Sequence, residues 1–490
     1  MTTAKDHAEV VVVGGGSSGA VVAGRLAEAG VEVLLIEAGP DYGHFDDGRW
    51  PTEILDATAL ATTHDWGYTS GPLEGREPWT WERARILGGC SAHNGAIAAV
   101  GHHSDYDAWG LPGWSTDELR PVFEVALERM RVRAYEDAEA TPFHRRCLEA
   151  AATAGWAIAS DLCDLDANEG FGLETVNIVD GVRWNTAFAY LDPVRGSGRL
   201  RILDNALVDR LVAGSQGWQV LLAGGGASIG TDTVVLAAGV YGTPAILQRS
   251  GIGDPDRLRS VGIEPVVDLP LVGTNLHDHP MISAGRELTP QLRSELDQAV
   301  LRGIVPEEQT LGKARSSAAT DGVFDLHVFP VCASIQTALT GGMGLVEVAG
   351  MTPRSRGSLH VTSPDPEAAP FIDHAYLSDP ADHDLTLLRD GLELAEELLE
   401  QSALADVLEP APRRNRSDDE IRREVAHYFH PVGTTPMGAD QATSVCDARG
   451  GVHGVEGLVV ADVSLMPQIP RANTNIPAIV LGERVAGFLH

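Results

Sequence analysis

The sequence predicts a protein of the α/β fold class, built around a parallel sheet, and three observations support this prediction. An apolar run at residues 10–13 leads through a glycine-rich turn into a helical pattern and a second apolar run at residues 31–36. Similar runs recur at residues 233–238 and 457–461, and a last helix is predicted over residues 475–489. Runs that are apolar throughout are typical of strands buried on both faces of a parallel sheet. Finally, 490 residues exceed the roughly 250–300 that one hydrophobic core usually supports, so we expect more than one substructure.

The first strand, turn, helix and strand form a βαβ unit. Its helix-forming stretch covers residues 20–29, and Gly30 ends it. In the turn, Gly14, Gly16 and Gly19 have the G-x-G-x-x-G spacing of dinucleotide-binding folds. The first glycine permits a tight turn, the second lets the backbone approach a pyrophosphate, and the third lets the helix pack against its strand. The amino end of the following helix offers free N–H groups to phosphates.

Glu37 stands at the end of the second strand, where a carboxylate can accept hydrogen bonds from a ribose 2′-hydroxyl. The same negative charge would repel a 2′-phosphate, which disfavours NADP. The glycine spacing by itself does not separate NAD from FAD. We therefore expect a Rossmann-like domain that binds one of these two dinucleotides.

The composition argues against several classes of partner. A formal net charge of −33 disfavours binding to nucleic acid or to an anionic membrane. No run of about 18 apolar residues occurs, so we expect no membrane span. Residues 1–9 are polar and show no secretion leader, and we expect a cytoplasmic protein. The five cysteines are scattered without a C-x-x-C pair, so we expect neither a disulfide framework nor a metal site.

Later blocks of the chain resemble those of one enzyme family. They are residues 85–94 (RILGGCSAHN) with 105–109 (DYDAW), 239–247 (GVYGTPAIL) with 250–253 (SGIG), 275–280 (NLHDHP), 355–358 (SRGS), 430–438 (HPVGTTPMG), and 460–467 (VADVSLMP) followed by Asn475. In these blocks the chain resembles the glucose–methanol–choline (GMC) oxidoreductases, nearest to the choline oxidase and alcohol dehydrogenase branch with a His–Asn catalytic pair. The blocks follow the family's order and span nearly the whole chain.

The resemblance implies bound FAD and an architecture, α+β overall, of two domains. The first is a Rossmann-like FAD-binding domain formed by residues 1–40, 85–105, 195–284 and 440–490. The second is a substrate-binding or cap domain, with an antiparallel sheet flanked by helices, formed by residues 41–84, 106–194 and 285–439. Residues 290–322 are polar and weakly periodic, and we expect them to form a mobile lid or loop.

The resemblance also assigns residues to the cofactor. Ser17 and Ser18 are expected at the pyrophosphate, Val208 by the adenine, and Asp462 near the ribityl–pyrophosphate region. The full set of expected FAD contacts is Gly14, Gly16, Ser17, Ser18, Gly19, Glu37, Ala38, Trp66, Arg85, Gly89, His93, Asn94, Gly95, Val208, Asp462 and Asn475.

The reaction that the resemblance implies is oxidation of an alcohol to a carbonyl compound. The hydroxyl proton passes to a base, and a hydride passes from the same carbon to flavin N5. A histidine near its ordinary pKa of about 6.5 suits the proton step. His430 has the family position of this base. Asn475 has the partner position, where members carry His or Asn, and its amide can position the hydroxyl.

His93 has the place of a histidine that, in the branch of choline oxidase and pyranose dehydrogenase, is bonded covalently to the flavin 8-methyl group. We expect this link, and the alternative is a ring that packs beside the dimethylbenzene moiety without a bond. We interpret Cys90 as a replacement for a small Ser, and not as a nucleophile.

Most of the 17 histidines are expected to be structural, because a given histidine is more often a surface or core residue than a catalyst. His427 and His453 have no motif around them and belong to this group. His277 and His279 are expected to make backbone hydrogen bonds at the turn into the substrate region.

Several functional alternatives stay open. We favour an oxidase, with O2 as electron acceptor, over a dehydrogenase that uses another acceptor. A flavin-dependent lyase or decarboxylase of the same family is a second alternative, and a flavoprotein used only for binding or electron relay is a third. Residues 285–350 contain only Phe324 and Phe329 as aromatics, too few for a cage around the quaternary ammonium of choline. We expect a small neutral alcohol, either sugar-like or a natural-product intermediate.

Overall fold

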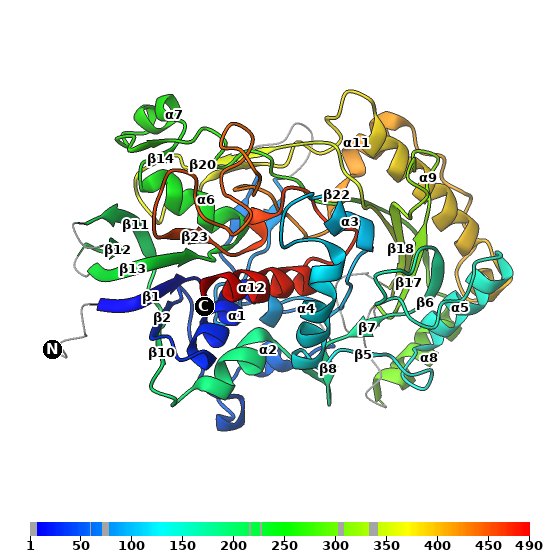
Figure 1. Cartoon of the computed structure of the whole chain (residues 1–490). Helices are drawn as coiled ribbons and strands as arrows, with labels where there is room; N and C mark the ends of the chain where they lie inside the picture. The colour runs from blue at the N-terminus through cyan, green and yellow to red at the C-terminus, as the bar shows by residue number, and fades with distance from the viewer. Residues whose placement is uncertain are drawn as a thin grey trace.

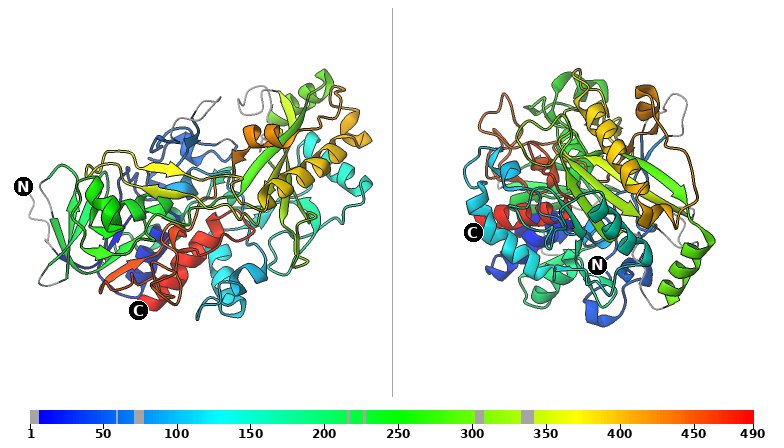
Figure 2. Two further views of the ribbon diagram at one scale, coloured as in Figure 1. Left: turned by 90° about the horizontal axis from the view of Figure 1, so that it is seen from above. Right: turned by 90° about the vertical axis from the view of Figure 1, so that its right-hand side faces the viewer.

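The computed structural model describes residues 7–58, 60–70, 78–214, 217–225, 228–301, 308–332 and 342–490. Two large sheets organise the chain, one toward the left and one toward the right of Figure 1. The end-on view in Figure 2 is rounder than the view from above, so the line that joins the two sheets is the long axis of the molecule.

The first sheet joins strands from the start, the middle and the end of the chain. Its parallel part contains β10 (Leu200–Leu203), β2 (Val33–Ile36), β1 (His7–Val13), β13 (Ser228–Leu236) and β23 (Leu458–Val460). The antiparallel pair β11 (Val208–Ala213) and β12 (Trp218–Leu222) extends it beside β13. Val11 is paired with Leu34 on one side and Val234 on the other, and all three are buried. The predicted parallel sheet is confirmed.

Helices cover this sheet, and two of them begin beside the glycine turn. Helix α1 (Ser17–Glu28) packs against α12 (Asn475–Leu489), which also contacts α4 (Thr116–Arg129). The approach of α1 and α12 is close, since a Cβ on Gly482 would lie 2.8 Å from the carbonyl oxygen of Ser18. The last helix has its predicted limits, whereas α1 begins three residues before the expected start because Ser17 and Ser18 already have helical backbone. Helix α6 (Gly239–Arg249) follows β13.

The second sheet is antiparallel, as expected for the substrate part. Its order is β22 (Ala426–His427), β16 (Pro280–Glu287), β19 (Met343–Gly350), β18 (Leu326–Val331), β17 (Thr310–Ala314) and β6 (Gly170–Leu173). Helix α9 (His383–Leu399) packs so closely on it that a Cβ on Gly391 would lie 2.0 Å from Cγ1 of Val348. Helices α5 (Pro142–Thr153) and α8 (Pro290–Leu301) contribute to the same core.

The prediction of a loop over residues 290–322 is wrong, and the mobility expected of this segment stays a prediction. This segment contains α8 and β17, and residues 302–307 within it lie outside the described residues. Helix α8 buries Leu292, Leu296 and Ala299 on one face, a narrow apolar stripe that weak periodicity conceals. All five residues of β17 are buried because the strand lies between β18 and β6, so its position in the sheet decides its burial more than its composition does.

Shorter elements complete the chain. The helices are α2 (Thr52–Leu55), α3 (His103–Asp107), α7 (Pro255–Ser260), α10 (Ser402–Ala405) and α11 (Asp418–Glu424). The strands form two-stranded pairs: β3 (Tyr68–Thr69) with β4 (Thr80–Trp81), β5 (Arg133–Ala134) with β7 (Thr175–Val176), β8 (Ile178–Val179) with β9 (Val182–Arg183), β14 (Ile252–Gly253) with β15 (Val267–Asp268), and β20 (Ser358–His360) with β21 (Phe371–Asp373).

The domain boundaries drawn from the sequence stay a proposal, and three contacts bear on them. Strand β16 begins at Pro280, before the expected boundary at residue 284, and it belongs to the second sheet. Helix α4 and the π-helical turn Ala187–Leu191 fall in the expected cap domain but pack in the core of the first sheet. These contacts favour assigning both segments to the nucleotide-binding part.

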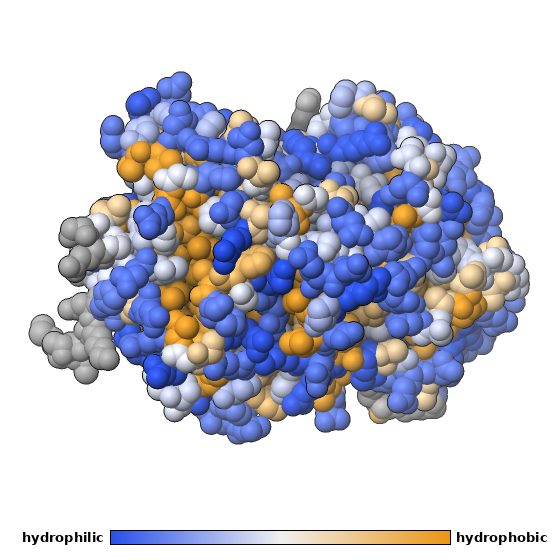
Figure 3. All heavy atoms as spheres, viewed as in Figure 1, coloured by the Kyte–Doolittle hydropathy of each residue, from blue (hydrophilic) through white to orange (hydrophobic). Residues whose placement is uncertain are grey.

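The face of the molecule seen in Figure 3 is mostly polar. Figure 3 shows polar residues over most of the visible face, with apolar ones gathered toward the side of the parallel sheet. No helix in the described part of the chain is both long and apolar enough to cross a bilayer.

Candidate active site

The glycine turn after β1 has the backbone that an anion cradle needs. Gly14 has a φ of +97°, and a Cβ there would lie 2.4 Å from the carbonyl oxygen of Ala237. A Cβ on Gly19 would lie 1.9 Å from the carbonyl oxygen of Gly14, so the helix packs directly on the turn. Gly16 precedes α1 without a side-chain cap, and the first turn carries no acidic residue. The free N–H groups and the positive end of the helix dipole are therefore available to a phosphate.

The 85–94 block docks on this turn. The N–H of Gly88 donates to the carbonyl oxygen of Gly15 at 2.7 Å. Gly89 has a φ of +53°, and a Cβ on it would lie 2.5 Å from Cα of Gly16. Gly16 and Gly89, far apart in the sequence, thus meet backbone to backbone, which only glycine permits here.

Glu37 fixes the turn from the side of β2. Its Oε2 accepts the N–H of Gly15 at 2.8 Å, and its Oε1 accepts the N–H of Gly39 at 2.7 Å. Burial raises the pKa of this carboxyl, and the backbone hydrogen bonds act in the opposite direction. The carbonyl oxygen of Glu37 accepts the N–H of Ala206, which leads into β11 and the buried Val208.

Ala38, Arg85 and Trp66 form one contact chain beside Glu37. Nε of Arg85 donates to the carbonyl oxygen of Ala38 at 3.3 Å. The guanidinium carbon of Arg85 lies 4.7 Å from the centre of the Trp66 ring, which stacks on Tyr68.

His93 is buried, and its Nε2 donates to the carbonyl oxygen of Thr63 at 2.8 Å. Burial lowers the pKa of His93, which keeps the ring neutral. Next to it, Oδ1 of Asn94 accepts the N–H of Ala96 at 3.0 Å, and Gly95 is exposed.

Asp462 ties the C-terminal segment to α6. Its Oδ2 accepts the N–H of Gly239 at 2.8 Å and the hydroxyl of Thr243 at 2.5 Å. Its Oδ1 accepts the N–H of Ser464 at 2.8 Å. Burial raises the pKa of Asp462, while these hydrogen bonds favour the carboxylate.

Asn475 is the first residue of α12 and lies beside the first residue of α1. Its Oδ1 accepts the hydroxyl of Ser17 at 3.0 Å, and Ser18 donates to the carbonyl oxygen of Ala478 at 2.8 Å. The buried Nδ2 of Asn475 has no hydrogen-bond partner among the residues that the structure describes. An amide donor is therefore left unsatisfied where two helix N-termini meet, which is the arrangement that an acceptor on a ligand would complete.

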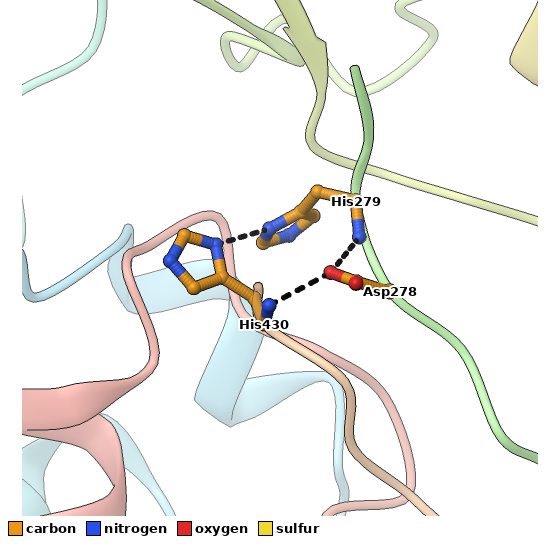
Figure 4. A group of neighbouring side chains, drawn as sticks. All are labelled: Asp278, His279 and His430. Carbon is orange, nitrogen blue, oxygen red and sulfur yellow. Dashed lines mark hydrogen bonds between the residues drawn. The ribbon is translucent and has the colours of Figure 1, made fainter. Parts of the chain in front are cut away.

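His430 lies in a second cluster, drawn in Figure 4. Nδ1 of His430 lies 3.2 Å from Nδ1 of His279, and the other ring nitrogen of His430 points away from this pair. Oδ1 of Asp278 accepts the backbone N–H groups of His279 and His430 at 2.7 and 3.0 Å. Oδ2 of Asp278 accepts the hydroxyl of Tyr376 at 2.8 Å.

Strand pairing explains why the two imidazoles meet. β16 and β22 are antiparallel, with Pro280 opposite His427. His279 directly precedes β16, and His430 follows β22 by three residues. A bridge between His277 and Val432 closes the turn on its far side.

Comparison with known proteins decides the family. Residues 8–281 and residues 353–482 match the N-terminal and C-terminal family models described as GMC oxidoreductase. The chain belongs to the GMC oxidoreductase family. Choline oxidase of Arthrobacter globiformis is 30% identical to it over 98% of this chain and 94% of its own length.

Solved structures agree with this assignment. Pyridoxine 4-oxidase from Mesorbium loti has a TM-score of 0.84 and 28% identity, with 99% of both chains covered. Formate oxidase of Aspergillus oryzae, in a structure concerned with modification of its FAD, has a TM-score of 0.85. At 24% identity, with 99% of this chain and 98% of that chain covered, this second likeness shows the shared fold.

FAD is the cofactor of this GMC oxidoreductase, and the residues around the glycine turn fit it. The uncapped start of α1 and the glycine contacts that exclude any Cβ form a backbone cradle whose N–H groups suit its phosphates. Ser17, Gly89 and Glu37 all lie against this cradle through the contacts given above.

The electrostatics of the second cluster keep His430 neutral. Its pKa is held well below the ordinary value, first by burial and then by His279, His327 and Arg83. Burial raises the pKa of Asp278 to about 6. A neutral imidazole can accept a proton, and a nearby carboxylate would stabilise the imidazolium that results.

Asp278, His279 and His430 present ligand atoms within 4.8 Å of one another, a spacing that metal sites also show. The carboxylate of Asp278 already accepts three hydrogen bonds from protein donors. This favours a hydrogen-bonded support for the two histidines over a set of ligands.

The expectation for His279 is wrong in part. Its ring contacts His430 and does not merely fix a backbone turn, and no sequence signal distinguishes it from its neighbour His277. His277 behaves as expected, with Nδ1 against the carbonyl oxygen of Asn275 and Nε2 accepting the N–H of Ile469. His453 contacts Ser444, and His427 packs against Trp81, which agrees with structural roles.

Proposed function

We propose that this GMC oxidoreductase oxidises a small neutral alcohol to a carbonyl compound, with His430 accepting the hydroxyl proton and Asn475 positioning the hydroxyl oxygen. Bound FAD supplies the acceptor for the hydride that leaves the alcohol carbon. The family membership and the similarity to choline oxidase and pyridoxine 4-oxidase support alcohol oxidation by a flavoenzyme.

The observation that carries the proposal is the state of the His430 ring. One ring nitrogen is engaged with His279, the ring is buried, and its lowered pKa keeps it free of a proton near neutral pH. The unprotonated ring nitrogen can accept the hydroxyl proton, and its pKa below the ordinary value makes it a weaker base than the histidine near 6.5 expected from the sequence.

Asn475 complements this base. Since its Oδ1 is occupied by the Ser17 hydroxyl, the Nδ2 group is the part of the amide that remains to donate. A donor aimed at the oxygen stabilises the negative charge that develops there as the proton leaves.

The electron acceptor and the substrate are the finer parts of the proposal. We favour O2 as acceptor because two of the similar proteins are named as oxidases of alcohols, choline oxidase and pyridoxine 4-oxidase. We favour a neutral alcohol because residues 285–350 contain only Phe324 and Phe329 as aromatic side chains, too few for a cage around a quaternary ammonium.

Anaerobic flavin reduction tests the proposal. A panel of neutral polyols, aryl alcohols and choline is mixed with the holoenzyme, and bleaching of the flavin is followed in a stopped-flow instrument. We expect His430→Ala to slow bleaching by about two to four orders of magnitude, with His453→Ala as the matched control. Unchanged bleaching in His430→Ala would remove His430 from the mechanism. Repeating the reaction in air and measuring peroxide separates an oxidase from a dehydrogenase.

A further inference from the structure

We propose that His279 is a positioning residue that holds the proton of neutral His430 on Nδ1, so that Nε2 of His430 is the atom that accepts the alcohol proton. This inference rests on the proposed function, and it names the device that makes His430 a base.

The inference follows from the number of protons that the contact between the His279 and His430 rings can hold. Their Nδ1 atoms lie 3.2 Å apart, so exactly one proton belongs between them: two N–H groups would repel, and two lone pairs would leave both atoms unsatisfied. A neutral imidazole carries one N–H and one lone pair. The position of the shared proton therefore fixes the tautomer of both rings at once.

The surroundings of His279 select between the two arrangements. Nε2 of His279 is buried and makes no hydrogen bond to the residues that the structure describes, and the backbone groups that bear on the ring are the carbonyl oxygens of Pro470 and Met351. A carbonyl oxygen only accepts hydrogen bonds, so it favours a proton on the ring nitrogen of His279 that faces away from His430. With its proton on Nε2, His279 has a lone pair on Nδ1 and accepts the N–H of His430.

The same arrangement leaves Nε2 of His430 without a proton. Figure 4 shows this nitrogen on the side of the ring opposite His279. When Nε2 takes the hydroxyl proton, the O–H bond breaks and an N–H bond forms, and the resulting imidazolium keeps its Nδ1–H donated to His279. The reversed arrangement would place a proton on Nε2, which would make His430 a donor and no base.

The backbone and the packing hold both rings in this contact. The carboxylate of Asp278 accepts both backbone N–H groups, and the ring of Tyr428 lies 4.3 Å from that of His430. Phe329 stacks on Tyr428 with ring centroids 4.7 Å apart. The His430 ring therefore has little freedom to turn its Nδ1 toward another acceptor.

Two variants at position 279 separate a proton-directing role from a packing role. In His279→Asn, the amide oxygen can take the place of Nδ1 and accept from His430. In His279→Leu, the volume is kept and the acceptor is lost. We expect His279→Leu to slow anaerobic flavin reduction by about ten- to a hundredfold, since a wrong histidine tautomer is costly to a base, and His279→Asn to restore most of the rate.

The tautomer itself is read by 15N NMR of the holoenzyme labelled at histidine, with His430→Ala used to assign the resonances. We expect His430 in the wild type and in His279→Asn to carry its proton on Nδ1, and in His279→Leu to populate both tautomers. A wild-type His430 protonated on Nε2, or a Leu variant with the wild-type tautomer and rate, would overturn the inference. If instead His430→Ala reduces its flavin normally, the proposed function fails, while the NMR result still decides the tautomer.

Discussion

The hydroxyl of Ser17 donates a 3.0 Å hydrogen bond to the side-chain oxygen of Asn475, across 458 residues of sequence. Each residue is the first of its helix, so the bond joins the N-termini of α1 and α12. Because this bond uses Oδ1 of Asn475, the Nδ2 group is the part of the amide without a partner among the described residues. The remaining half is a donor, in a position where two helix dipoles favour negative charge.

Replacing Asn475 with Asp tests this polarity. The carboxylate would keep an acceptor for Ser17 but would lose the donor and add a charge that repels a developing alkoxide. We expect the rate of anaerobic flavin reduction to fall by about two to three orders of magnitude. Ser17→Ala, which only frees the amide to rotate, should cost about tenfold or less. Equal rates in Asn475→Asp and the wild type would show that this amide does not act on the substrate.

Gly89→Ala tests the contact between the two glycine blocks. The added Cβ would lie 2.5 Å from Cα of Gly16, at a residue whose φ of +53° already disfavours a side chain. We expect the purified variant to contain less FAD, with an affinity lowered by about tenfold or more, measured from the ratio of flavin to protein absorbance. Gly487→Ala is the matched control, because it lies on the exposed end of α12 with no atom within 4 Å. Full FAD content in Gly89→Ala would mean that the turn is less tight than the structure indicates.

Acid precipitation tests the covalent link at His93. We expect the yellow colour to stay with the precipitated wild-type protein and to be released from His93→Ala. The low pKa of His93 favours the neutral ring that such a bond requires, and its Nε2 is hydrogen-bonded to Thr63. Colour found wholly in the supernatant of the wild type would leave His93 as a packing residue.

The buried carboxyl of Asp278 predicts a pH dependence of stability. Its pKa is raised to about 6, above the value near 4 of an unfolded chain. The folded protein therefore holds this proton more tightly, and the stability it contributes is complete below about pH 4 and is lost as the pH rises through 6. Between pH 4 and 7 the wild type should lose about 3 kcal/mol of its free energy of unfolding through this group. Asp278→Asn, which has no proton to lose at this position, should not show this loss. The measurement is the difference between wild-type and variant urea-unfolding curves at these two pH values, and parallel pH dependence would contradict it.

The nucleotide-binding part could be predicted because its signals are local. Residues 10–13 and 33–36 are apolar throughout, which indicates buried parallel strands, and the glycine spacing between them indicates a dinucleotide-binding turn. The resemblance then supplied the antiparallel second sheet, which local patterns do not reveal. Residues 290–322 show why: β17 is buried because it lies between two other strands, and pairing partners far along the chain cannot be read from composition.

The candidate site divides in the same way. The motifs identified candidate site residues, which include Glu37, Asp462, His430 and Asn475. The structure shows the hydrogen-bond or ring contacts of each. The contact between His279 and His430 could not be predicted from the sequence, because it depends on the register between β16 and the two-residue strand β22. A strand that short has no periodicity to detect.

The strand order of the second sheet places β16 and β22, which carry the histidine contact, far from the opposite edge of the sheet. β22 and β16 form one edge, next to the histidine pair, whereas β17 and β6 form the opposite edge, beyond β19 and β18. Insertions or exchanges at the far edge can change that part of the sheet while the two imidazoles keep their mutual geometry. Sequence changes at that edge, in nature or in a library, can therefore leave the contact between His279 and His430 intact.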